Sequence, residues 1–119
     1  MEISSHEQNG VILYRISGEV RTEDIIKFWN RLFSDYPILK DYLGIITVFL
    51  DASLKQEDTN LNYLVEYFTG NLDRLRDLKI AVVMDTPMVT STIILGQRLK
   101  QLQIKPFTTE KGALEWIRI

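Results

Sequence analysis

Two apolar segments without polar alternation constrain the fold of this chain more than any other feature. They cover residues 44–50 (GIITVFL) and 79–84 (KIAVVM). A strand that is covered on both faces of its sheet has such a sequence, whereas a strand with one face in water alternates apolar with polar residues. We therefore expect two central strands in a sheet that helices cover.

Two other segments have the periodicity of amphipathic helices. The first follows Thr22, which is placed to cap the helix, and it ends at Pro37. The second runs from about residue 60 to residue 72. The residues expected to face the core are Ile25, Phe28, Trp29, Leu32, Phe33 and Tyr36 in the first helix, and Leu61, Leu64, Val65, Phe68 and Leu72 in the second.

The remaining elements indicate a mixed sheet. Asn9-Gly10 separates strands at residues 1–5 and 11–17 and favours a hairpin, because both residues tolerate a positive φ. The other expected elements are a third helix from Thr86-Pro87, a strand at 104–107 and a helix after Thr108 or Thr109. We predict one α/β domain over residues 1–119, with a mixed five-stranded sheet opened by a β-hairpin and with four helices.

Charge and composition exclude several function classes. The net charge is −2, so the chain lacks the basic excess that nucleic acid or an anionic membrane surface requires. It has no signal-peptide pattern and no apolar run of membrane-spanning length, which predicts a soluble, cytoplasmic protein. With no cysteine and a single histidine, His6, no nucleophile and base can be assembled. We expect no enzyme, no cofactor and no metal site.

Three segments, taken in their order, resemble a known family. They are GEVRTED at 18–24, AVVMDTP at 81–87 and FTTEKGALEWI at 107–117. Together they are similar to SpoIIAA-like domains, which belong with the STAS domains of anti-sigma-factor antagonists and are related to the SEC14-like lipid-binding fold. The resemblance implies a bacterial, non-catalytic regulatory domain that binds a protein. The alternative is a domain that binds a small-molecule or lipid-like ligand.

The resemblance also implies a candidate phosphorylation site. In STAS antagonists a serine at the start of the helix after the third strand is phosphorylated, within a pattern of aspartate, two serines and glycine. The corresponding residues here are Asp58, Thr59, Asn60 and Leu61, so the serine pair and the glycine are missing. Thr59 is the first candidate and Ser53 the second, and we expect the usual phosphoserine switch to be absent. Alternatively, Asp58 or Asn60 only caps the helix.

Polar residues gather where two parallel strands are expected to end. Asp51 follows one strand, and Asp85 and Thr86 follow the next, at the edge where open α/β sheets bind ligands. The same residues are equally suited to cap helices. Asp51, Thr86 and Lys105 also resemble three residues of response-regulator receiver domains. Residues 16–19 supply only one acid for the magnesium ion that a receiver needs, which argues against that family.

Side chains on the outer faces of two helices suggest a surface for a protein partner. Tyr63 and Tyr67 are expected to lie opposite the apolar stripe of the second helix, and Ile94 outside the core sector of the third. Exposed aromatic residues are enriched at interfaces, although scattered apolar residues on a surface are also ordinary. The sequence therefore predicts a homodimer or a complex with another protein through these helices.

Overall fold

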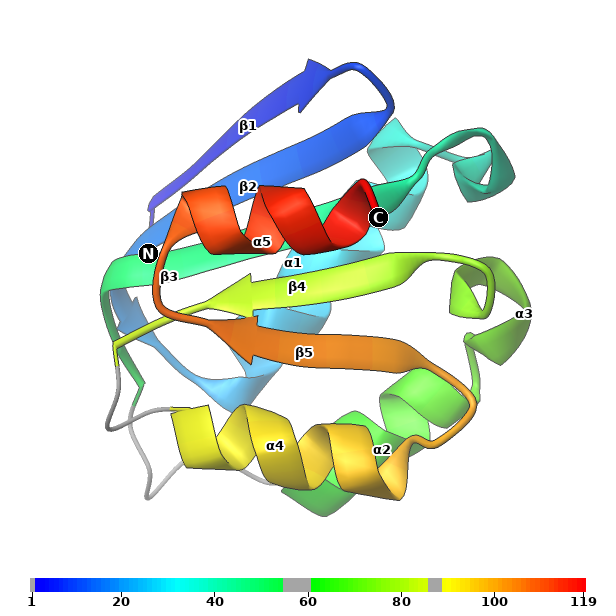
Figure 1. Cartoon of the computed structure of the whole chain (residues 1–119). Coiled ribbons are helices and arrows are strands. Elements are labelled where there is room, and N and C mark those ends of the chain that lie inside the picture. The colour runs from blue at the N-terminus through cyan, green and yellow to red at the C-terminus, as the bar shows by residue number, and fades with distance from the viewer. Residues whose placement is uncertain (1, 55–60, 86–88) are drawn as a thin grey trace.

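The computed structural model describes residues 2–54, 61–85 and 89–119, which form a five-stranded sheet with helices on both faces (Figure 1). The strands are β1 (Glu2–Gln8), β2 (Val11–Val20), β3 (Gly44–Leu54), β4 (Lys79–Val83) and β5 (Gln103–Phe107). Their spatial order follows the chain, with β1 antiparallel to β2 and every other neighbouring pair parallel. The predicted mixed sheet is confirmed.

The hairpin that opens the sheet turns where the sequence predicts. Asn9 and Gly10 have φ values of 52° and 81°, in the left-handed region that favours asparagine and glycine. The turn sets the register of β1 on β2, from Glu2 opposite Ser17 to Gln8 opposite Val11. The hairpin prediction is therefore confirmed.

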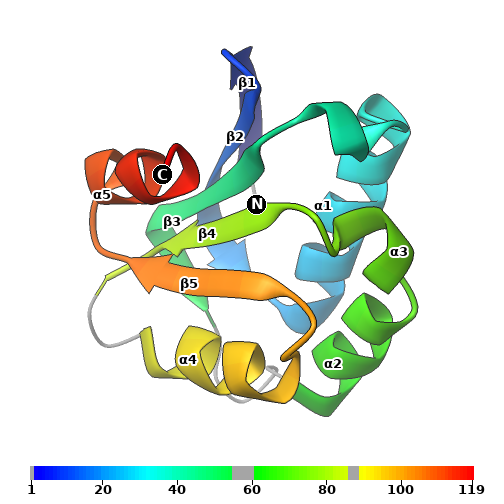
Figure 2. The same ribbon diagram turned by 45° about the vertical axis from the view of Figure 1, so that its right-hand side comes forward.

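Helices cover the two faces of the sheet unequally (Figure 2). The helices α1, α2 and α4 lie on one face, and α5 lies alone on the other. The helical elements in the described part of the chain are α1 (Thr22–Asp35), the short 3-10 helix η1 (Leu39–Asp41), α2 (Leu61–Thr69), α3 (Leu72–Leu75), α4 (Val89–Arg98) and α5 (Glu110–Ile117).

The second predicted helix, expected over about residues 60–72, ends at Thr69 in α2, and the short helix α3 follows it from Leu72. Gly70 interrupts the predicted helix, since glycine is the least favourable non-proline residue inside a helix. The side chain of Asn71 then donates a hydrogen bond to the Tyr67 carbonyl at 2.8 Å, and the Thr69 hydroxyl donates to the Val65 carbonyl at 2.7 Å. The Asn71 side chain thus satisfies the Tyr67 carbonyl, which the N–H of residue 71 would engage in a continuing helix. The Thr69 hydroxyl adds a bond to a carbonyl within the last turn of α2.

Two strands extend further than the sequence predicts. β2 continues through Gly18, which has a φ of 87°, and ends at Val20 after a register shift between Arg15 and Ser17. β3 continues with it to Leu54, so Asp51 lies inside this strand and not after its end. The prediction that the strand ends before Asp51 was wrong, because pairing with the longer β2 supports a longer β3.

The start of α1 also differs from the prediction. Arg21 is the N-cap residue, and Thr22 is the first helical residue and is buried. The Asp24 carboxylate accepts a hydrogen bond from the backbone N–H of Arg21 at 3.0 Å, which fixes this end of the helix. The predicted Thr22 cap was wrong, whereas Thr109 does cap α5, accepting from the Gly112 N–H at 3.1 Å.

Hydrophobic side chains pack on both faces of the sheet. On the face under α1 and α2, the ring of Phe28 meets that of Tyr14 edge-on at 4.8 Å, and the ring of Trp29 meets that of Phe68 at 5.3 Å. On the opposite face, Ala113 and Ile117 of α5 belong to a second buried cluster.

The core under α1 also contains one tyrosine hydroxyl. The Tyr14 hydroxyl donates a hydrogen bond to the Asp35 carboxylate at 3.2 Å. The pKa of Tyr14 is raised, mainly by burial and to a smaller extent by the negative charge of Asp35.

Candidate functional site

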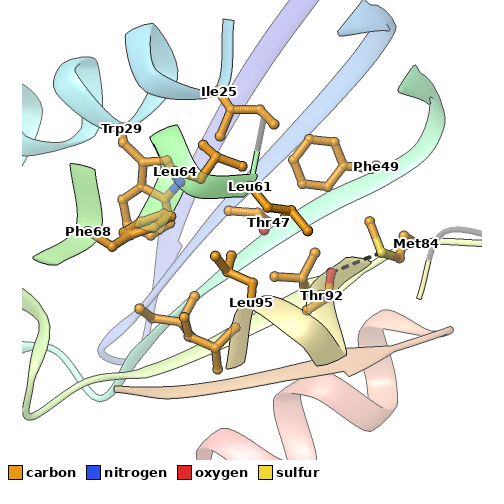
Figure 3. A pocket seen from close by; sticks show the side chains of 13 residues that line it. Ile25, Trp29, Thr47, Phe49, Leu61, Leu64, Phe68, Met84, Thr92 and Leu95 are labelled. Carbon is orange, nitrogen blue, oxygen red and sulfur yellow. Dashed lines mark hydrogen bonds between the residues drawn. The ribbon is translucent and has the colours of Figure 1, made fainter. Parts of the chain in front are cut away.

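A partly enclosed cavity of about 80 Å³ lies between the sheet and the helices α1, α2 and α4 (Figure 3). Some of the side chains around it are only partly buried, among them Ile25, Leu61 and Val82, so the cavity is not sealed within the core. The lining residues are Ile25, Trp29, Thr47, Phe49, Leu61, Leu64, Phe68, Ile80, Val82, Met84, Thr92, Leu95 and Ile104.

Simple periodicities bring these side chains together. Leu61, Leu64 and Phe68 recur at helical spacing on the inner face of α2. Ile80 and Val82 alternate along β4 toward the same side, as successive residues of a strand point to opposite faces. The sequence predicts the inward orientation of such residues, but periodicity does not specify whether the space between them is filled.

The polar side-chain groups of the described lining are the hydroxyls of Thr47 and Thr92, the indole N–H of Trp29 and the thioether of Met84. Thr92 is 6% exposed, and its Oγ1 donates to the Sδ of Met84 at 3.2 Å. Thr47 is 2% exposed, and its Oγ1 donates to the Ala81 carbonyl at 3.4 Å. Because no described residue of the lining is ionisable, the cavity suits an uncharged ligand and offers no acid or base for catalysis.

The polar residues predicted at the strand ends are described only in part. Asp51 and Ser53 lie within β3, opposite Ser17 and Glu19 of β2. Asp85 follows β4 and is exposed. Thr59 and Thr86 lie outside the described residues. The phosphorylation and strand-end ligand sites therefore stay predictions.

The residues predicted for a partner surface differ in their exposure. Tyr63 is 53% exposed on α2 and Ile94 is 38% exposed on α4. Tyr67 instead packs on the Phe68 ring and donates through its hydroxyl to Asn30 Oδ1 of α1 at 2.6 Å, and burial raises its pKa. Ile93, which is 44% exposed, was not predicted to lie on this surface. Thr92 and Leu95 both point toward the core at helical spacing, which could have predicted that Ile93 lies on the outer face of α4.

The face of the sheet under α5 has two further hollows. One of about 320 Å³ is lined by residues of β1, β2 and β3, and one of about 170 Å³ lies beside Leu114 and Arg118. Glu110 borders both, and it forms an ion pair with Arg15 at 2.8 Å. Because both side chains are largely exposed, this pair adds little stability.

Two negative findings concern the described residues. Within 2–54, 61–85 and 89–119, no helix is long and apolar enough to cross a membrane. The same residues contain no group of three or more histidine, cysteine, aspartate or glutamate side chains that could hold a metal ion.

Comparison with known proteins gives matches at the level of structure. No protein-family model and no curated protein matches the sequence. The anti-sigma factor antagonist SpoIIAA in its unphosphorylated form superposes with a TM-score of 0.62 at 14% identity, over 98% of both chains. An anti-sigma factor antagonist from Mycobacterium paratuberculosis gives a TM-score of 0.65 at 16% identity, over 99% of this chain and 94% of that one.

A third solved structure is an uncharacterised protein of the DUF3478 family with a SpoIIAA-like fold, from Shewanella loihica PV-4. It gives a TM-score of 0.62 at 14% identity, over 98% of this chain and 92% of that one. All three similarities extend over nearly the whole chain and share its strand-and-helix architecture. The chain thus has the SpoIIAA-like fold that its three sequence segments predict.

Proposed function

We propose that this domain is a non-catalytic regulatory module of the bacterial cytoplasm that acts by binding a protein. Two structures with the same fold are described as anti-sigma factor antagonists, which supports a regulatory role. The proposal does not depend on a phosphoserine switch, since the serine pair and the glycine are missing from residues 58–61.

The observation that carries this proposal is a set of exposed apolar side chains on two neighbouring helices. These side chains are Tyr63 of α2 and Ile93 and Ile94 of α4, which are 53%, 44% and 38% exposed. Arg98 of α4 donates to Asn62 of α2 at 2.7 Å, so the two helices are joined at the surface. Partly exposed tyrosine and aliphatic residues on a firmly held pair of helices are suited to an interface, either with a second copy or with another protein.

The double substitution Tyr63→Ala, Ile94→Ala tests this proposal. Truncating an interface anchor costs about 1 kcal/mol or more, so we expect the two changes together to weaken the complex by roughly tenfold or more. Sedimentation equilibrium measures self-association, and quantitative capture from cells measures other partners. The matched control is Ile38→Ala, because Ile38 is 57% exposed and lies outside α2 and α4. Unchanged assembly and unchanged capture in the double variant would contradict the proposal.

A second candidate function is the binding of a small apolar ligand in the cavity beneath α2 and α4. The observation in its favour is the cavity itself, with a volume of about 80 Å³ and an apolar lining. An engineered apolar cavity of about 150 Å³ binds benzene. The smaller space here suits a slender molecule, or one end of a longer one.

Titration with pentane tests the second candidate. We expect saturable changes in the methyl resonances of Leu61, Leu64 and Leu95, with no change at Leu114 on the far face. The variant Val82→Ile adds a methyl group to the lining, which excludes about one methylene of the ligand and weakens binding about fourfold. Pentane that causes no saturable shift in the unaltered protein would rule this function out.

A further inference from the structure

We propose that the cavity selects a small neutral molecule with one hydrogen-bond-accepting oxygen, such as a short-chain ketone, and that the Thr92 hydroxyl binds this oxygen. The proposal rests on the second candidate function, because it names the class of ligand for the same cavity. The observation that supports it is the acceptor of the Thr92 hydroxyl, which is the sulfur of Met84.

The Thr92 hydroxyl donates to a poor acceptor. Its Oγ1 lies 3.2 Å from the Sδ of Met84, and a thioether sulfur accepts hydrogen bonds only weakly. A buried donor without a good acceptor costs free energy, since it has given up its hydrogen bond to water. A carbonyl oxygen in the cavity would therefore offer Thr92 a better partner than the one it has.

The position of Thr92 makes this exchange geometrically feasible. Thr92 belongs to the lining of the cavity and comes from the inner face of α4 (Figure 3). Met84 follows β4, and its Sδ lies beside the Thr92 hydroxyl in the same lining (Figure 3). Its thioether can turn aside because the side chain is unbranched. An oxygen atom that enters the cavity thus meets the hydroxyl directly.

The rest of the lining sets the other properties of the ligand. No described lining residue carries a charge, so a charged ligand group would lose its hydration without compensation. The second hydroxyl, that of Thr47, has a carbonyl oxygen as its acceptor, that of Ala81 at 3.4 Å, whereas the acceptor of Thr92 is a sulfur. Among the described lining residues, the Thr92 hydroxyl is thus a donor held only by a weak acceptor in largely apolar surroundings, which suits an acceptor oxygen on an apolar molecule.

The test compares butanone with pentane, which have the same number of non-hydrogen atoms, by methyl chemical-shift titration. The variant Thr92→Val keeps the shape of the side chain and removes the donor. We expect it to weaken butanone binding about fivefold, the loss for one neutral hydrogen bond, and to change pentane binding by less than about twofold. The matched control Thr47→Val removes the hydroxyl that already has a carbonyl acceptor, and it should change butanone binding by less than about twofold.

A second variant keeps the test decisive if Thr92→Val does not fold. Met84→Leu conserves the volume and removes the sulfur, so the Thr92 donor gains from a ligand oxygen without first losing a partner. Butanone binding should then tighten at least about twofold, with pentane binding unchanged. Equal effects on both ligands, or no effect on either, would overturn the oxygen-binding role of Thr92 while leaving the apolar cavity as a ligand site. Failure of both ligands to bind the unaltered protein would overturn the ligand-binding function and this inference with it.

Discussion

Replacing Gly44 with alanine should destabilise the domain by about 3 kcal/mol, at the upper end of the usual cost of overpacking. A Cβ at this position would lie 2.5 Å from the carbonyl oxygen of Lys79 and 3.0 Å from Cγ2 of Ile117. The carbonyl belongs to the backbone of β4, which pairs with β3 from Gly44 onward. Ile117 is a buried residue of α5, so neither neighbour can move without disturbing the sheet or the helix.

Urea unfolding followed by circular dichroism measures this effect, and Gly70→Ala is the matched control. A Cβ at Gly70 would meet its nearest heavy atom at 3.5 Å, which is an ordinary contact. The control should therefore change the free energy of unfolding by less than about 1 kcal/mol. If the two variants were equally stable, the close approach of Gly44, Lys79 and Ile117 would not be a feature of the folded protein.

Phe28→Ala should cost about 3–5 kcal/mol of unfolding free energy, the range for removing a large aromatic side chain from a core. Phe28 is 1% exposed, and its ring packs edge-on against the rings of Tyr14 at 4.8 Å and Trp29 at 5.4 Å. The substitution leaves a cavity between α1 and the sheet and also removes two favourable aromatic contacts.

The same unfolding experiment separates this core position from the surface. Phe28→Leu keeps most of the apolar volume and should lose clearly less stability than Phe28→Ala. Ile38→Ala, at an exposed position, should change the free energy of unfolding by less than about 0.5 kcal/mol. A loss below about 2 kcal/mol for Phe28→Ala would mean that the cluster around Tyr14 and Trp29 is not packed as described.

Patterns that repeat along the chain predicted the architecture well. The continuous apolar segments became β3 and β4 in the middle of the sheet, and Asn9-Gly10 became the hairpin turn. In α1, Phe28, Trp29, Leu32 and Phe33 are all buried, as their spacing requires. These features depend on the local geometry of turns and on which side of a helix or strand faces the core. Both can be predicted from the residue pattern of a single sequence.

Features that depend on pairing between distant segments were predicted less well. The extension of β3 beyond Leu50 follows from its register on β2, and the Arg21 cap follows from the path by which β2 enters α1. The contact of the Tyr67 hydroxyl with Asn30 joins two helices far apart in the sequence. Helical periodicity places Tyr67 on an outer face of α2, but only the packing of α1 against α2 reveals that this face is covered.

The cavity lies beyond sequence prediction for a related reason. Leu64, Phe68 and Ile80 were predicted to face inward, and they do. The volume left between them depends on the separation of the helices from the sheet, to which many side chains contribute at once. The polar pair of Thr92 and Met84 is similarly a property of tertiary structure, because these residues come from different elements.

The order of the strands leaves β1 and β5 at the two edges of the sheet, and their sequences discourage the addition of further strands. β5 contains Pro106, which has no N–H to donate, beside the charged side chain of Lys105. β1 carries exposed His6 and Glu7, and charged residues at an edge oppose pairing with another chain. Both edges of the sheet therefore carry residues that disfavour edge-to-edge pairing, which directs any association with a partner to the helical surface and not to the strands.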